Sequence, residues 1–233
     1  MKTSTKLRTT GASRRQTVLI VDDHPMMREG LAQLLGQEAG LKVTGQAATA
    51  REAMELTEKQ ALDLVIADIS LPDKSGLELI KDLQAIHPGI RVLVISMHDE
   101  ALYAERVLRA GGRGYVMKQE GGRKILEAIH RVLAGQVHVS DTMSARLLET
   151  FSTKKPVTTP VERLTDREFE VFQMIGGGLG TREIAMKLHL SVKTVEVHRG
   201  NIKEKLDIRS APELIRYAVR WIEGQPGGGG GPC

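Results

Sequence analysis

The chain has 233 residues, of which 41% are hydrophobic and 27% are charged, enough for one large domain or two small ones. The 33 Lys and Arg residues outnumber the 29 Asp and Glu residues, so the net charge is +4 and the sequence pI is about 9.2. The single cysteine, Cys233, excludes a disulfide framework and a cysteine-based zinc site, and predicts a reducing, cytoplasmic setting. No apolar run is long enough for a membrane span, and the polar start argues against a secretory signal.

The charge and composition divide the chain into five parts. Residues 1–16 carry five cations and no anion, which predicts a disordered basic tail. The composition of residues 224–233 predicts a flexible Gly-rich tail. Between the tails we expect one domain at 17–135 and a second at 161–223. Residues 136–160 form a linker that includes a helix at 140–150.

Residues 17–135 alternate between short apolar runs and segments with helical periodicity. Such runs suit parallel strands that are buried on both faces of a sheet. Five strand–helix units in series predict a doubly wound, flavodoxin-like α/β domain with a five-stranded parallel sheet. We expect strands at 18–21, 41–47, 64–67, 92–95 and 115–117, and helices at 26–37, 50–59, 76–86, 100–110 and 121–134.

Residues 161–223 show no strand pattern and predict a small all-α domain. Thr165, Ser191 and Ser210 are suitable helix N-caps, and Thr165 with Glu168 forms a capping box. The glycines at 176–178 and 180 suit a turn between two helices. We expect the four helices at 166–176, 181–188, 192–206 and 211–222.

Polar side chains follow four of the predicted strands. Asp22 and Asp23 follow the first strand, Asp68 the third, Ser96 the fourth and Lys118 the fifth. The carboxyl ends of strands in an open α/β sheet form the ligand crevice. Three carboxylates in one crevice need a compensating cation such as Mg²⁺, and a hydroxyl and an ammonium suit the oxygens of a phosphoryl group. The sequence thus predicts a phosphate-accepting aspartate; ordinary strand-end turn residues are the alternative.

Four motifs in this domain resemble the receiver domain of bacterial two-component response regulators. They are V-D-D-H-P-x-x-R-x-G-L at 21–31, D-I-x-L-P-x-x-x-G at 68–76, V-I-S-M-H at 94–98 and G-Y-x-x-K at 114–118. The resemblance implies that Asp68 is the phosphoacceptor. It also implies a Mg²⁺ site formed by Asp22, Asp23, Asp68 and the backbone carbonyl of Ser70.

The same resemblance implies roles for the remaining polar residues of the crevice. Ser96 would contact the phosphoryl group and Lys118 would pair with it. Tyr115 would turn inward when Ser96 moves, although plain core packing is the alternative. Ser70 and His98 occupy the positions that tune the dephosphorylation rate in the family. Neither His24 nor His98 has the partner spacing of a metal ligand.

Residues 181–206 predict a helix–turn–helix with a polar ridge on its second helix. Residues 181–205 carry six cations and three anions, but a solvated face of a small bundle explains that charge equally well. The motifs L-T-x-R-E at 164–168, R-E-I-A at 182–185, S-V-K-T-V-E-V-H at 191–198, N-I at 201–202 and K-L at 205–206 resemble the LuxR-type DNA-binding domain of NarL/FixJ response regulators. The resemblance implies a four-helix domain whose third helix, 192–206, enters the major groove.

Carried onto this sequence, the resemblance assigns residues that would contact DNA. Thr181 and Arg182 would contact phosphates at the start of a helix. Many relatives have Lys where Glu196 and Gly200 stand. Glu cannot contact phosphate favourably but can accept a hydrogen bond from cytosine N4, so the DNA preferences of relatives do not transfer. The remaining DNA-facing positions are Lys193, Thr194, Glu196, Val197, Arg199, Gly200 and Lys203.

These resemblances predict a transcriptional regulator phosphorylated by a sensor histidine kinase. A phosphorylated homodimer would bind roughly palindromic promoter sites on double-stranded DNA, with RNA polymerase as a further candidate partner. The apolar face of the last helix packs internally or forms a dimer contact through Leu214, Ala218, Trp221 and Ile222. The only expected catalysis is self-phosphorylation at Asp68 and its reversal.

Two alternatives stay open. One is an enzyme with an aspartyl-phosphate intermediate, but Ser70 stands where a D-x-D phosphatase has its second acid. The other is a regulator that works without phosphorylation, and the complete set of polar crevice residues argues against it.

Overall fold

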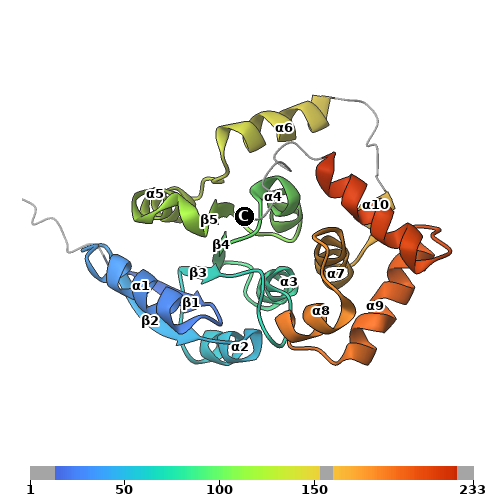
Figure 1. Cartoon of the computed structure of the whole chain (residues 1–233). Helices are drawn as coiled ribbons and strands as arrows, with labels where there is room; N and C mark the ends of the chain where they lie inside the picture. The colour runs from blue at the N-terminus through green and yellow to red at the C-terminus, as the bar shows by residue number, and fades with distance from the viewer. Residues whose placement is uncertain (1–13, 153–159, 225–233) are drawn as a thin grey trace, which may run out of the picture.

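The computed structural model describes residues 14–152 and 160–224, which form a sheet domain and a helical domain (Figure 1). The expected basic tail up to residue 13, the Gly-rich tail from residue 225 and linker residues 153–159 lie outside the described residues. Among the helices of the described part, none is both long and apolar enough to cross a membrane.

The first domain contains the predicted sheet. Its strands are β1 (Gln16–Val21), β2 (Leu41–Ala47), β3 (Leu64–Ala67), β4 (Arg91–Ser96) and β5 (Gly114–Met117). All neighbouring strands pair in parallel, in the order β2-β1-β3-β4-β5. The prediction of a doubly wound, five-stranded parallel sheet is therefore confirmed. Because the strand order reverses at β1, the crevice opens at the carboxyl ends of β1 and β3.

Helices cover both faces of the sheet, as the continuous apolar runs predict. One face carries α1 (Pro25–Gly36) and α5 (Gly122–Leu133), and the other carries α2 (Ala50–Lys59), α3 (Gly76–Ile86) and α4 (Glu100–Arg109). Along β1, Val18 and Ile20 belong to the core under α1 and α5, whereas Leu19 and Val21 belong to the opposite core. Alternate strand residues point to opposite faces, so both faces of β1 must be apolar.

Three further elements connect the sheet to the second domain. A 3₁₀ turn, η1 (Lys118–Glu120), follows β5 and leads into α5. Helix α6 (Asp141–Ser152) packs against α4, and a second 3₁₀ turn, η2 (Pro160–Arg163), precedes the helical domain.

The helical domain consists of α7 (Asp166–Gly176), α8 (Thr181–Lys187), α9 (Val192–Lys205) and α10 (Ala211–Glu223), so the four predicted helices are confirmed. The predicted caps form as expected. Thr165 Oγ1 accepts from the backbone N–H of Glu168, whose carboxylate accepts from the N–H of Thr165. Ser191 Oγ accepts from the N–H of Thr194 at the start of α9, and Ser210 Oγ accepts from the N–H of Glu213 at the start of α10. Each cap satisfies a backbone donor that has no partner within the helix.

Helix α10 uses most of its apolar face inside its own domain. Leu214 and Ala218 are fully buried, and Trp221 and Ile222 are half-buried. Leu214 and Ala218 cannot contact a second copy while the domain keeps this fold, so the structure assigns these two residues to the core rather than to a dimer contact. Ile215, with 42% of its surface exposed, is the large apolar residue that α10 leaves at the surface.

Helix α7 lies on the side of the helical domain that faces the sheet domain (Figure 1). Every residue from Asp166 to Gln173 is buried, because α7 packs against α9 and α10 on one side and against the sheet domain on the other. A single apolar cluster continues from one face of the sheet into the helical domain. The two domains are therefore in direct contact.

Candidate functional site

The polar side chains at the strand ends meet in one crevice. Lys118 Nζ lies 2.6 Å from Asp68 Oδ2 and 2.7 Å from Asp22 Oδ2, and all three side chains are buried. The backbone holds the two carboxylates near each other, because the N–H of Asp68 donates to the carbonyl of Val21. This hydrogen bond extends the pairing of β3 with β1. Asp22, Asp68 and Lys118 thus come together from the ends of β1, β3 and β5, as the topology requires.

The crevice keeps an excess of negative charge. Burial acts to lower the pKa of Lys118, but the Asp68 and Asp22 carboxylates outweigh it and hold that pKa above its usual value. One ammonium therefore faces two buried carboxylates. The negative charge that Lys118 leaves unbalanced in the crevice can be neutralised by one hard divalent cation.

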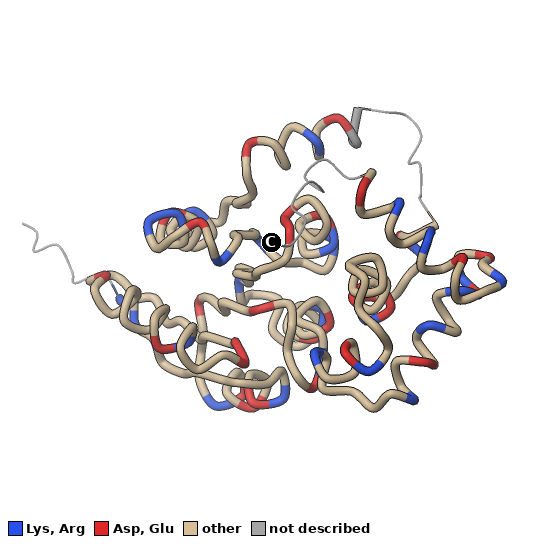
Figure 2. The backbone as a smooth tube through the Cα atoms, in the orientation of Figure 1, with Lys and Arg blue, Asp and Glu red and all other residues tan. Residues whose placement is uncertain are grey.

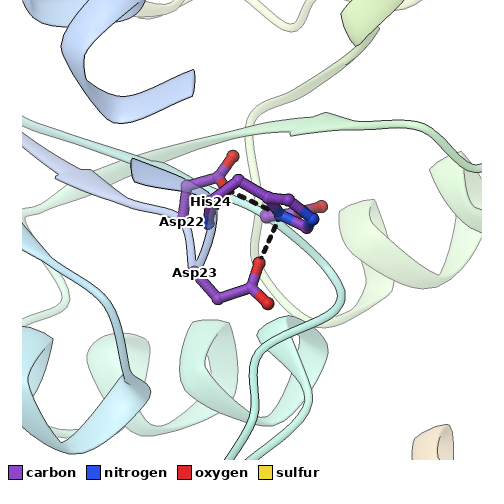
Figure 3. A group of neighbouring side chains, drawn as sticks. Asp22, Asp23 and His24 are labelled. Atoms are coloured by element: carbon purple, nitrogen blue, oxygen red, sulfur yellow. Dashed lines mark hydrogen bonds and ion pairs between the residues drawn. The ribbon is translucent and has the colours of Figure 1, made fainter. Parts of the chain in front are cut away.

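Asp23 and His24 complete the acidic cluster (Figure 3). Ligand atoms of Asp22, Asp23, His24 and Asp68 all lie within 4.8 Å of one another. The three carboxylates are the oxygen donors that Mg²⁺ prefers. His24 was not expected near a metal, yet its Nδ1 lies 2.6 Å from Asp23 Oδ1. Its ring is largely exposed, so His24 stands at the entrance to the cluster.

The loop after β3 packs the start of α3 against the backbone of Asp68. A Cβ at Gly76 would lie 2.1 Å from the carbonyl oxygen of Asp68, so only glycine permits this approach. The N–H of Gly76 donates to the carbonyl of Ile69, and Ser75 Oγ caps α3. Ser70 lies in the same loop, between Asp68 and α3.

The other predicted switch and tuning residues surround the same crevice. Ser96 is buried at the end of β4, and Tyr115 is buried on β5. The hydroxyl of Tyr115 donates to the carbonyl of His98 at 2.8 Å, and burial raises the Tyr115 pKa, which keeps that donor protonated. Ser70 Oγ and His98 Nε2 lie 2.8 Å apart. Burial also lowers the pKa of His98, although the Asp68 charge opposes this shift.

The second candidate site is the outer face of α9, which lies at the edge of the molecule away from the sheet (Figure 1). Lys193, Glu196, Val197 and Gly200 are exposed there, whereas Val195 points into the core. Glu196 and Glu204 interrupt the lysine and arginine residues along α9 (Figure 2), so the helix presents no continuous basic patch.

Most of the remaining predicted DNA positions are half-buried. Thr194 is half-buried, and its N–H and hydroxyl both bond to Ser191 Oγ in the cap of α9. Arg199 and Lys203 are also half-buried, on the flanks of the exposed face. Thr181 and Arg182 lie at the start of α8, where Thr181 is half-buried and Arg182 is exposed.

Contacts between the domains were missed by sequence reasoning. Ser75 Oγ donates to Glu170 Oε1 at 2.6 Å, although the two residues are 95 positions apart. Asp166 pairs with Lys81 at 2.6 Å and with Arg106 at 3.4 Å. No local pattern distinguishes these side chains from ordinary caps and surface charges, so no sequence signal could have identified them.

Two family models match the chain. The response regulator receiver domain matches residues 18–130, and the model of bacterial regulatory proteins of the LuxR family matches residues 162–218. These segments coincide with the sheet domain and with most of the helical domain.

Relatives and solved structures extend the match over both domains. The oxygen regulatory protein NreC of Staphylococcus haemolyticus is 34% identical over 87% of this chain and 96% of its own length, and NreC of Staphylococcus aureus is 33% identical over the same shares. RcsB from Salmonella enterica serovar Typhimurium, solved on promoter rprA with phosphomimetic BeF3⁻, is 27% identical over 88% of this chain and 99% of that chain, with a TM-score of 0.59. A LuxR-family response regulator from Aurantimonas sp. SI85-9A1 is 30% identical over 60% of this chain and 99% of that chain, with a TM-score of 0.55. The chain therefore belongs to the family of two-component response regulators in which a receiver domain is followed by a LuxR-type DNA-binding domain.

Proposed function

We propose that Asp68 accepts a phosphoryl group from the phosphohistidine of a sensor histidine kinase. The observation that carries this proposal is the buried crevice in which Asp68 and Asp22 share Lys118. A carboxylate oxygen of Asp68 attacks phosphorus, the phosphorus–nitrogen bond breaks, and the histidine leaves with its electron pair. The Lys118 ammonium and the Ser96 hydroxyl then bind the new phosphoryl oxygens.

Asp22, Asp23 and Asp68, with the backbone carbonyl of Ser70, would hold Mg²⁺ in this crevice. The donor set fits, because the three carboxylates supply closely spaced oxygens and one ammonium does not balance their charge. A bound magnesium ion neutralises charge on the phosphoryl oxygens. Ser70 and His98 control how readily water reaches the aspartyl phosphate, and they thereby set its lifetime.

The output of the protein is promoter binding by α9 in the major groove. Lys193, Glu196, Val197 and Gly200 form the central DNA-facing surface, because they are the exposed members of the predicted set on α9. RcsB, a relative of known structure, has been solved on promoter DNA with a phosphomimetic and as two dimers on two parallel DNAs. Flanking contacts come from Thr181, Arg182, Thr194, Arg199 and Lys203.

Phosphorylation would favour a homodimer on roughly palindromic sites in the bacterial cytoplasm. A two-fold dimer places its recognition helices about one helical turn of DNA apart. Because Leu214 and Ala218 are fully buried, the half-buried Trp221 and Ile222 are the members of the predicted set on α10 that can reach a second copy.

The proposal is tested by phosphorylation of the full chain with acetyl phosphate, followed by Phos-tag electrophoresis with Mg²⁺ or with EDTA. We expect a mobility shift that requires Mg²⁺ and is absent in Asp68→Asn. Asp82→Asn on α3 is the matched control, because it makes the same chemical change on a half-exposed carboxylate outside the crevice. A shift that persists in Asp68→Asn would contradict the assignment.

A second experiment measures DNA binding and the oligomeric state. Duplexes selected from a random library by the full-length protein are titrated with and without BeF3⁻, and the oligomeric state is followed by gel filtration. We expect tighter binding and a larger species with BeF3⁻ in the wild type but not in Asp68→Asn. Equal binding and equal size under all conditions would support the regulator that works without phosphorylation.

A further inference from the structure

His24 stands between the acidic cluster and helix α1, and its backbone is held on both sides. Its N–H donates to Asp22 Oδ1 at 2.9 Å, and its carbonyl accepts from the N–H groups of Met27 and Arg28 in the first turn of α1. His24 is the N-cap residue of α1, yet its side chain makes no capping hydrogen bond. The backbone therefore fixes where the side chain begins, and the helix does not use the imidazole.

The Nδ1 atom of the imidazole faces the carboxylates of the cluster (Figure 3). It lies 2.6 Å from Asp23 Oδ1 and 3.4 Å from Asp22 Oδ1. The side chain of His24 is 69% exposed, so dense packing does not force the ring into this position. Two ligands at neighbouring corners of an octahedral ion, each about 2.1 Å from it, lie about 3 Å apart. The two measured separations fall on either side of that value.

The contact between His24 and Asp23 is close, but it does not satisfy the carboxylate. Asp23 Oδ1 is buried and has no hydrogen-bond partner in the described part of the chain, although His24 Nδ1 is only 2.6 Å away. An N–H aimed at this oxygen would form a hydrogen bond at that distance. A buried oxygen without a partner is costly, and a cation that binds both atoms removes that cost. The short separation and the unpartnered oxygen therefore both point to a shared cation.

An imidazole nitrogen changes which cation the cluster prefers. Mg²⁺ prefers oxygen ligands and keeps several waters, so a nitrogen adds little to its binding. Mn²⁺ and Co²⁺ accept carboxylate oxygen and imidazole nitrogen together, and Co²⁺ binds a given site of this kind more tightly than Mn²⁺. A neutral imidazole can carry its proton on Nε2 and leave the Nδ1 lone pair free for the ion. Three carboxylates and one imidazole within 4.8 Å are therefore a donor set for a divalent transition ion.

We propose that His24 Nδ1 is a ligand of the cation in the crevice, and that it makes the site favour a divalent transition ion over Mg²⁺. The transition ion binds the carboxylates of the cluster together with this nitrogen, whereas Mg²⁺ binds through the oxygens alone. This inference rests on the proposed metal site in the crevice. It adds to that site a nitrogen ligand that the sequence did not predict.

The proposal is tested by calorimetric titration of the full-length protein with Co²⁺, Mn²⁺ and Mg²⁺, in the wild type and in His24→Asn. Asparagine is a good N-cap and offers an oxygen in place of the nitrogen, so the start of α1 is preserved. We expect His24→Asn to weaken Co²⁺ binding at least about tenfold, because even the loss of a residue that only supports a metal ligand has an effect of that size. Mn²⁺ binding should weaken by a smaller factor, and Mg²⁺ binding should stay unchanged.

A spectroscopic measurement identifies the ligand directly. With Mn²⁺ bound, electron spin echo envelope modulation detects nitrogen nuclei that are coupled to the ion. We expect the coupling of an imidazole nitrogen in the wild type and its loss in His24→Asn. His130→Asn is the matched control, because it makes the same change on an imidazole that lies 3.4 Å from a carboxylate, that of Glu38, outside the crevice. It should keep both the nitrogen coupling and the Co²⁺ affinity of the wild type.

Asp23→Asn separates this inference from the metal site itself. If Asp23→Asn weakens the binding of all three ions but His24→Asn keeps the wild-type selectivity and nitrogen coupling, the metal site stands and the inference is overturned. A wild type that binds Mn²⁺ without nitrogen coupling also overturns it, and leaves His24 as a surface partner of Asp23. If Asp23→Asn and His24→Asn both bind every ion as the wild type does, the proposed metal site fails and the inference fails with it.

Discussion

Ser70 and His98 form a hydrogen bond across the phosphorylation crevice, with Ser70 Oγ 2.8 Å from His98 Nε2. The two residues come from the loops after β3 and β4, and each was assigned separately to control of the dephosphorylation rate. Their contact ties the two loops together beside Asp68. We therefore expect the pair to act as one unit in limiting the access of water to an aspartyl phosphate.

Ser70→Ala should shorten the lifetime of the aspartyl phosphate. Loss of the hydrogen bond frees the His98 ring and opens a path for water, and a bond of this kind is worth about a twofold to tenfold change in rate. The decay of the Phos-tag-shifted band after removal of acetyl phosphate measures it. An unchanged or longer lifetime would show that the pair does not shield the site.

Lys118→Met should destabilise the receiver in a way that Mg²⁺ partly reverses. The substitution leaves two buried carboxylates without their cation, which costs about 3–5 kcal/mol for a buried pair. Urea unfolding with and without Mg²⁺ measures the free energy of unfolding. Lys124→Met is the control, because its pair with Glu120 lies at the surface, where water screens the two charges. Equal losses in the two variants would contradict a structural role for Lys118 in the crevice.

Glu196→Ala should relax DNA specificity at one base pair. Glu196 is exposed on the outer face of α9, where its carboxylate can accept from cytosine N4, a contact worth about 1–3 kcal/mol of discrimination. Library selection with the wild type and the variant measures the preference at each position. Glu204→Ala makes the same charge change near the far end of α9 and should leave the preference intact. If both variants gain affinity equally with no change in preference, Glu196 reads no base.

Glu170 and Glu168 should give opposite pH dependences of stability. Burial raises the pKa of Glu170 above 4.5, although Arg167 and Ser75 act against it. A raised pKa means that the folded state binds the proton more tightly than the unfolded state. The contribution of Glu170 to the free energy of unfolding is therefore full below pH 4.5 and is lost as the pH rises through the pKa of Glu170 in the folded state. Relative to Glu170→Gln, the wild type should therefore lose stability as the pH rises.

The matched variant is Glu168→Gln. Burial acts to raise the pKa of Glu168, but Lys205 and the backbone of Thr165 outweigh it, so the pKa is lowered. The contribution of Glu168 to stability is therefore present above pH 4.5 and is lost as the pH falls through the pKa of Glu168 in the folded state. Urea unfolding followed by Trp221 emission from pH 3 to 7 measures both differences. If the stability difference between wild type and variant changes with pH in the same direction for both residues, one of the two pKa directions is wrong.

The sequence alone was sufficient to predict the order of elements and the crevice. Apolar runs between helical segments predicted β1, β3, β4 and β5, and the same rule placed their polar ends at one edge of the sheet. Caps such as Thr165 were also predictable, because a cap depends on residues within four positions of each other. These features depend on periodicity and local chemistry, which the sequence displays directly.

Only the tertiary structure decided how the two domains meet. The burial of α7 on all sides, the Ser75–Glu170 hydrogen bond and the use of Leu214 in the core depend on contacts between segments far apart in the chain. An apolar helix face looks the same in sequence whether it packs in its own domain, on the receiver or on a second copy. Packing between distant surfaces decides among these partners, and periodicity along the chain carries no information about that choice.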